Sequence, residues 1–169
     1  MHYPVRVLAI VVALLAVALP GAAVEVGNNA PSVSMPRLDD SGKNVTLASM
    51  RGKVVYVDFW ASWCVPCRIS MPTLDRLFKE NAAKGFEVVG VNKDVRSDDA
   101  ERFLKRVPVS FVLVADSSDN LAKAFNVKTM PSGYLIDRKG VVRHIHGGFT
   151  RSTSDALAEQ VEKLLAEKP

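Results

Sequence analysis

The stretch of sequence that decides the fold runs from Val54 to Cys67 and reads VVYVDFWASWCVPC. Its first part, Val54–Trp60, is almost entirely β-branched or aromatic, which is typical of a strand buried on both faces of a parallel sheet. Its last four residues are Cys-Val-Pro-Cys, and apolar residues at helical spacing beyond them predict a helix from about Cys64 to Ala83. A cysteine pair therefore lies at the junction between a buried strand and a helix.

Strand and helix signals alternate along the rest of the chain. Strands are predicted at 33–38, 45–47, 86–91, 112–114, 133–136 and 141–145, and helices from about Asp98, at 121–125 and at 154–166. The first two strands form a hairpin around Asp39–Lys43, and the last two are joined by Asp137–Gly140. This order predicts an α/β sandwich with a mixed sheet.

Composition limits the class of protein. The 169 residues suit one domain, and 48% hydrophobic with 24% charged residues excludes disordered and collagen-like chains. Two cysteines are too few for a disulfide-knit scaffold. The net charge of +4 comes from scattered residues without a basic stripe, so no nucleic-acid partner is predicted.

The first 23 residues have the pattern of a targeting segment. Met1–Arg6 carries one basic residue and no acid, and the apolar run Val7–Leu19 is followed by Pro-Gly-Ala-Ala. This pattern predicts a secretory signal peptide with cleavage after Ala23, and the alternative is an uncleaved membrane anchor. Either interpretation exports the remaining domain, residues 24–169, to the periplasm or another extracytoplasmic compartment.

The spacing of Cys64 and Cys67 puts both sulfur atoms on one helix face, within disulfide reach. The positive end of a helix favours a thiolate at Cys64, lowering its pKa from about 8.5, and Pro66 suits a first turn because it has no N–H. Cys67 lies one turn deeper, as a resolving thiol would. A zinc site needs four ligands, and the only downstream candidates, His144 and His146, are expected on a solvent-facing strand. Redox chemistry is therefore favoured over a metal site.

Asp58 and Pro131 are further candidates. A carboxyl group inside a buried strand should have a raised pKa and could exchange a proton with Cys67. The alternative is a strand-end aspartate that points to solvent or caps a turn. Thr129-Met130-Pro131 precedes an edge-type strand, where a cis peptide would present backbone groups to an extended substrate. Residue preferences alone do not assign that cis bond.

Taken together, these residues resemble the thioredoxin superfamily. Asp58–Arg68 looks like the active-site stretch of that family, Pro72 falls where the family kinks its active-site helix, and Met130-Pro131 resembles the cis-proline loop. The resemblance extends from about residue 30 to residue 165 and is closest to exported TlpA/ResA-like and cytochrome c maturation thioredoxins. It implies a thioredoxin-like three-layer α/β/α sandwich with an N-terminal β-hairpin extension and a helix–strand insert at about 98–114.

The resemblance also implies roles for single residues. Cys64 is the expected nucleophile and Cys67 the resolving thiol, and the match strengthens Asp58 as the buried acid. The expected substrate-binding residues are Trp63, Pro66, Met130 and Pro131. Two features depart from the pattern: Val65 stands where some relatives carry a glutamate, and no lysine matches the one that accompanies the buried acid in thioredoxin.

The expected activity is that of an exported thiol:disulfide oxidoreductase, acting as a reductase of protein disulfides. It needs no metal and no cofactor beyond the redox-active disulfide itself. Its expected partners are a disulfide-containing protein and a membrane thiol that donates electrons, with apocytochrome c, a copper chaperone or an oxidase subunit as substrate. The alternatives are a Sco-like copper metallochaperone, which is expected to use a C-x-x-x-C pair and a distant histidine, and a peroxiredoxin-like peroxidase.

Overall fold

The computed structural model describes residues 24–39 and 41–168, which form seven strands and four α-helices. The strands are β1 Ser34–Pro36, β2 Asn44–Thr46, β3 Val54–Trp60, β4 Phe86–Asn92, β5 Val112–Ala115, β6 Ser132–Ile136 and β7 Val142–Gly147. The helices are α1 Cys67–Asn81, α2 Ser97–Leu104, α3 Asn120–Ala124 and α4 Arg151–Ala166. The predicted targeting segment, residues 1–23, lies outside the described residues. Within the described residues, the chain forms no helix of the length and apolarity that a membrane span requires.

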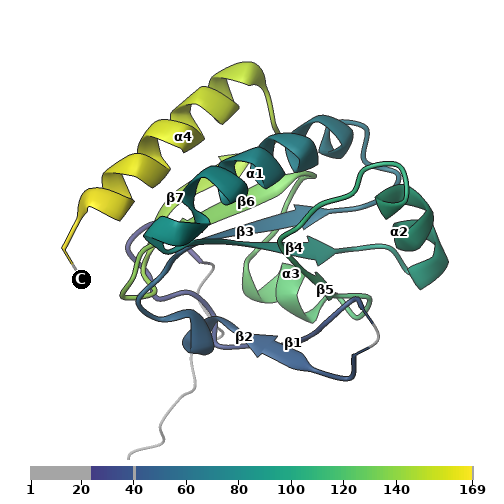
Figure 1. Cartoon of the computed structure of the whole chain (residues 1–169). Coiled ribbons are helices and arrows are strands. Elements are labelled where there is room, and N and C mark those ends of the chain that lie inside the picture. Colours follow the sequence, from purple (N-terminus) through teal and green to yellow (C-terminus); the bar gives the residue numbers. More distant parts are fainter. Residues whose placement is uncertain (1–23, 40, 169) are drawn as a thin grey trace, which may run out of the picture.

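The centre of the molecule is a mixed sheet with the strand order β5-β4-β3-β6-β7 (Figure 1). Strands β3, β4 and β5 are parallel, whereas β6 runs antiparallel to β3 and to β7. Helices α1 and α4 cover one face and α3 the other, as Figure 1 shows. The predicted three-layer α/β/α sandwich with a mixed sheet is therefore confirmed.

Strand β3 is buried at all seven positions, as its composition predicts. Alternate residues face opposite sides of a strand. Tyr56 and Trp60 pack with the core under α1 and α4, whereas Val57 and Phe59 pack with the core over α3. Asp58 lies two residues from both Tyr56 and Trp60 and so shares their face of the strand. Its carboxyl group therefore points to the α1 side.

Two helices begin about one turn away from the predicted residue. Helix α1 begins at Cys67 instead of Cys64, because two short turns precede it: the amide of Cys64 donates to the carbonyl of Ala61 at 3.1 Å, and that of Cys67 to the carbonyl of Cys64 at 3.2 Å. Helix α4 begins one turn earlier than predicted, because the Thr150 hydroxyl caps it by accepting from the amide of Thr153.

The N-terminal hairpin of β1 and β2 extends the molecule beyond the β5 edge of the sheet. Its residues pair antiparallel, and Arg37 forms a bridge to Val114 of β5. The amide of Leu38 also donates to the carbonyl of Leu113 at 3.0 Å. Met35 of this hairpin is fully buried against the α3 side of the sheet, so the extension is packed onto the domain.

Two glycines flank Asp58 in the sheet: Gly90 on β4 and Gly133 on β6 are its register partners. The ring of Tyr56 lies over Gly133, and a Cβ atom there would stand 1.7 Å from the Tyr56 hydroxyl. Gly133 therefore provides the space that the Tyr56 side chain occupies.

The substitution Gly133→Ala should destabilise the protein, because Tyr56 has to move out of the core position it holds. We expect the free energy of unfolding, measured by urea denaturation, to fall by about 1–3 kcal/mol. The control is Gly147→Ala on β7, where the nearest atom to a new Cβ is Thr129 Cγ2 at 3.5 Å and the change should stay within about 0.5 kcal/mol. Equal losses in the two variants would contradict this assignment.

Candidate active site

The two cysteines form a disulfide with a Cα–Cα distance of 5.3 Å at the start of α1. Cys64 is 4% exposed and Cys67 is fully buried. The neighbours Trp63 and Val65 are among the most exposed apolar residues described, at 64% and 67%. An incoming disulfide therefore meets Cys64 first, and Cys67 is reached only through it.

The position of the pair favours a thiolate at Cys64 once the disulfide is reduced. Cys64 lies three residues before the first residue of α1, close to the end of the helix where the dipole is positive. Arg68 follows the pair but is exposed to solvent, so its charge is screened. The dipole is therefore the main local source of stabilisation for that thiolate.

Asp58 is 1% exposed, on the face of β3 that α1 covers. The alternative of a solvent-facing strand-end aspartate is therefore wrong. Burial raises the pKa of Asp58 well above its ordinary value, and no nearby cation offsets this effect among the described residues. The neighbouring position on β4 is Gly90, so no lysine side chain reaches the carboxyl group from there. Asp58 therefore lacks, on this side, the positive charge that accompanies the buried acid in thioredoxin.

The Met130–Pro131 peptide bond is cis. It precedes β6, which is an interior strand between β3 and β7 and not the edge strand that we predicted. Met130 and Trp63 line one groove of about 610 Å³, together with Val95, which is 88% exposed. Pro66 is also exposed but is not among the residues lining this groove.

Asp94 holds the loop before Cys64 and was missed in the sequence. Its buried carboxylate accepts hydrogen bonds from the amide of Ser62 at 3.0 Å, the hydroxyl of Ser62 at 2.8 Å and the side-chain amide of Asn92 at 2.8 Å. The available signal was the polar run Asn-Lys-Asp at 92–94 directly after a buried strand, since functional loops follow the carboxyl ends of parallel strands.

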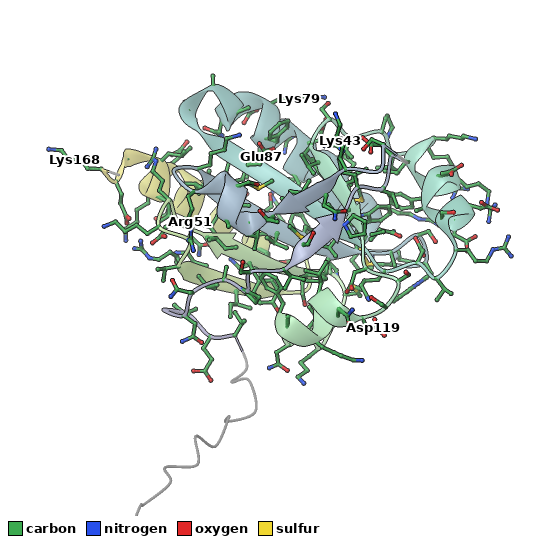
Figure 2. All side chains as sticks on the ribbon, turned by 90° about the horizontal axis from the view of Figure 1, so that it is seen from below. Lys43, Arg51, Lys79, Glu87, Asp119 and Lys168 are labelled. Atoms are coloured by element: carbon green, nitrogen blue, oxygen red, sulfur yellow. A yellow bond between two sulfur atoms is a disulfide. The ribbon has the colours of Figure 1, made fainter. Side chains whose placement is uncertain are left out.

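Lys93 was missed for the same reason. Its side chain is only 8% exposed and forms ion pairs with Asp116 at 3.0 Å and with Asp119, which Figure 2 labels beside α3. Asp116 in turn accepts hydrogen bonds from the amides of Leu121 at 3.0 Å and Ala122 at 2.9 Å in α3. Lys93 therefore ties the end of β4 to α3, at the floor of the groove that begins at Trp63.

His144 and His146 are half-buried and not fully solvent-facing as predicted. Their side chains lie on the α4 side of β7, where Lys163 and Gln160 of that helix act on them, whereas Ile145 between them is exposed. His146 Nδ1 lies 3.3 Å from the Tyr56 hydroxyl oxygen. Among the residues that the structure describes, no group of three or more His, Cys, Asp or Glu side chains is placed to hold a metal ion.

A mixed sheet of this order, with a Cys-x-x-Cys disulfide after its central strand, is the arrangement of thioredoxin-like thiol-disulfide oxidoreductases, and this chain is one of them. Residues 25–161 match the Redoxin family, and the chain belongs to that family.

Similar proteins agree with this assignment. The chain is 35% identical over 141 residues to the thiol-disulfide oxidoreductase ResA of Geobacillus kaustophilus, covering 83% of this chain and 80% of that protein. It is 32% identical over 127 residues to ResA of Bacillus subtilis, covering 75% and 70% of the two chains. A crystal structure from Chlorobium tepidum, assigned as a thiol:disulfide interchange protein DsbE, is 40% identical with a TM-score of 0.81 and covers 85% of this chain and 100% of that one.

The substitution Asp58→Asn should stabilise the oxidised protein at neutral pH. Because the folded pKa of Asp58 is raised above its unfolded value, its contribution to stability is complete below about pH 4 and is lost as the pH rises. We expect the variant to gain about 1–3 kcal/mol in free energy of unfolding at pH 7 and little at pH 4, measured by urea denaturation. The exposed Asp155→Asn variant is the control, and an equal gain at both pH values would refute the buried-acid assignment.

The substitution Asp94→Ala should loosen the loop before Cys64. It leaves the Ser62 amide and the Asn92 side chain without their acceptor, which costs about 1–3 kcal/mol in free energy of unfolding. Asp98→Ala removes an exposed ion pair at 3.5 Å and one acidic side chain from the first turn of α2, and it should cost less than about 1 kcal/mol. Comparable thermal denaturation curves for the two variants would contradict the anchoring role of Asp94.

Proposed function

We propose that this enzyme reduces protein disulfides outside the cytoplasm, with Cys64 as nucleophile, Cys67 as resolving thiol and Asp58 as the base that serves Cys67. The observation that carries this proposal is the asymmetry of the site: Cys64 borders exposed apolar residues, whereas Cys67 is fully buried on the side of the sheet to which Asp58 points. The similarity to ResA-type oxidoreductases supports the same assignment.

The reaction consists of two thiol–disulfide exchanges. The Cys64 thiolate attacks one sulfur of the substrate disulfide, the substrate S–S bond breaks, and a mixed disulfide forms while the first substrate thiolate leaves. The Asp58 carboxylate then takes the proton of Cys67, and the Cys67 thiolate attacks Cys64 Sγ. The Cys64–Cys67 bond forms, the mixed disulfide breaks, and the second substrate thiolate leaves. Two electrons pass from the enzyme to the substrate.

The charges at the site favour the reducing direction. Strong oxidants of this chemistry have a stabilised reduced form. Here the two residues between the cysteines, Val65 and Pro66, are uncharged, and a carboxylate at Asp58 would disfavour a thiolate at Cys67. The reduced form therefore receives little stabilisation beyond the helix dipole.

The substrate binds in the groove at Trp63 in this proposal. An extended segment beside the disulfide contacts Trp63 and Met130, and the backbone at the cis Pro131 pairs with it, while Pro66 contacts the substrate on the other side of Cys64. Apocytochrome c, a copper chaperone and an oxidase subunit are the substrate classes that we consider.

The compartment requires a source of electrons. Residues 1–23 act in this proposal as a signal peptide or membrane anchor that exports the domain. Thiols outside the cytoplasm are oxidised, so a thiol-carrying membrane partner has to reduce the Cys64–Cys67 disulfide after each turnover.

A Cys67→Ser variant should trap its substrate as a stable mixed disulfide on Cys64, because the resolving thiol is absent. The expected result is a covalent adduct that survives denaturing electrophoresis, disappears on reduction and yields one partner protein by mass spectrometry. The matched Cys64→Ser variant keeps one cysteine but loses the nucleophile and should trap nothing. Equal capture by both variants would overturn the assigned roles.

The reduction potential tests the direction of the reaction. We expect equilibration with a glutathione or dithiothreitol buffer to give a potential close to that of thioredoxin, about −270 mV. A value near about −120 mV, typical of a strong oxidant, would overturn the reductase proposal.

A further inference from the structure

Asp58 needs a route for protons to and from solvent. Burial favours its protonated form, so it has to release a proton before it accepts one from Cys67. Its side chain is 1% exposed, and Oδ2 is buried without a hydrogen-bond partner among the described residues. On the Gly90 side its neighbour is Trp60, whose Nε1 would stand 3.2 Å from a Cβ at Gly90. An indole N–H only donates, so that side offers no route for a proton.

The Gly133 side offers a group that both donates and accepts. The Tyr56 hydroxyl occupies the place of the absent Gly133 side chain, directly opposite Asp58 in the register of β3 and β6. Since opposite Cβ atoms of antiparallel strands stand about 5 Å apart, the hydroxyl and the carboxyl group are neighbours on this face of the sheet. No hydrogen bond joins them directly among the described residues, so a proton passes between them through one bridging water. Burial, and then the charge of Asp58, raises the pKa of Tyr56, so the phenol stays neutral.

His146 continues the row on the next strand. It is the register partner of Gly133, so Asp58, Gly133 and His146 lie side by side across β3, β6 and β7. Its Nδ1 lies 3.3 Å from the Tyr56 hydroxyl oxygen. The Tyr56 hydroxyl and the imidazole are therefore in direct contact. The row ends at β7, which is an edge strand of the sheet.

The surroundings of His146 indicate its tautomer. Burial lowers the pKa of His146, while Gln160 on α4 raises it and His144 lowers it further, so the ring is neutral at rest. Among the described residues, His146 Nε2 and Gln160 Oε1 are both buried without a hydrogen-bond partner, and they complement each other if Nε2 carries the proton. Nδ1 is then the acceptor for the Tyr56 hydroxyl. The other charged groups on this side, Arg143 and Lys163, act on His144.

We propose that Tyr56 and His146 form a proton relay between Asp58 and solvent at the edge where β7 meets α4. This inference rests on the proposed role of Asp58 as the base for Cys67. Before resolution, Asp58 gives its proton through one bridging water to the Tyr56 oxygen, and the Tyr56 proton passes to His146 Nδ1. The Nε2 proton then leaves when a water molecule reaches it beside the partly exposed Gln160. One proton leaves, and no electrons move.

The relay resets over a full catalytic cycle. After resolution, Asp58 holds the proton that it took from Cys67, and it returns this proton to the Cys67 thiolate when the disulfide is reduced again. A solvent proton then enters at His146 Nε2, the Nδ1 proton passes to Tyr56, and the Tyr56 proton passes to Asp58. His146 and Tyr56 are positioning residues in this scheme, because neither touches the reacting sulfur atoms.

The test separates the two exchange steps in the full-length reduced protein. Reaction with dithiobis-nitrobenzoate releases one coloured thiolate when Cys64 attacks and a second when Cys67 resolves the mixed disulfide. We expect Tyr56→Phe and His146→Ala to slow the second release by about tenfold at neutral pH, below the 10²–10⁴-fold of a direct acid–base group, and to leave the first unchanged. Added imidazole should restore the second release in His146→Ala, where it can occupy the vacated site, but not in Tyr56→Phe.

The control is His144→Ala, which removes the ring stacked on His146 at 6.5 Å but leaves the contact with Tyr56 in place; its second release should stay within about twofold of wild type. Slowing without imidazole rescue would assign His146 a merely structural role and overturn the relay. If Asp58→Asn slows the second release but Tyr56→Phe and His146→Ala do not, the relay is wrong and only the assignment of Asp58 as the base for Cys67 is retained. If Asp58→Asn leaves the second release unchanged, the base itself is wrong, and the relay fails with it.

Discussion

The Asp58 carboxyl group is buried in the middle of the sheet, and the residues around it are those that such burial requires. A charge at this depth is unfavourable without a partner, and no cation approaches it among the described residues. The sheet makes room beside it with Gly90 and Gly133, and Tyr56 and Trp60 lean into the spaces over those glycines. The polar groups that occupy the space over these glycines, the Tyr56 hydroxyl and Trp60 Nε1, therefore come from the strand of Asp58 itself.

The Cys64–Cys67 disulfide follows the strand that carries this carboxyl group. The strand that buries Asp58 leads through two short turns into α1, so Cys67 becomes the first residue of the helix and is sealed in the core. The loop that carries Cys64 is held from the next strand by Asp94, through Ser62. The end of that strand is in turn tied to α3 by Lys93. The loop after β3, the loop after β4 and α3 are thus linked at one edge of the sheet, and these links hold the loop that carries Cys64.

Much of this site could be predicted because it depends on contiguous residues. A strand of buried residues followed by Cys-Val-Pro-Cys predicts where the candidate site lies. An acidic residue inside that strand has to be buried whichever element packs on it. The start of α1 was misplaced because a turn and the first turn of a helix share the same short-range hydrogen bonds. Asp94 was missed because its partner Ser62 is 32 residues away in the sequence, in the loop that follows β3.

The histidines of β7 show which features the local sequence pattern predicts and which depend on tertiary packing. Their spacing alone put His144 and His146 on one face of a strand, but which face is covered depends on where α4 packs. The sequence by itself therefore determined the strand–helix junction, the cysteine pair and the buried acid, because short-range periodicity and burial decide them. Only the tertiary structure brought Tyr56 and His146 into one row with Asp58, because that row crosses three strands whose order no local pattern encodes.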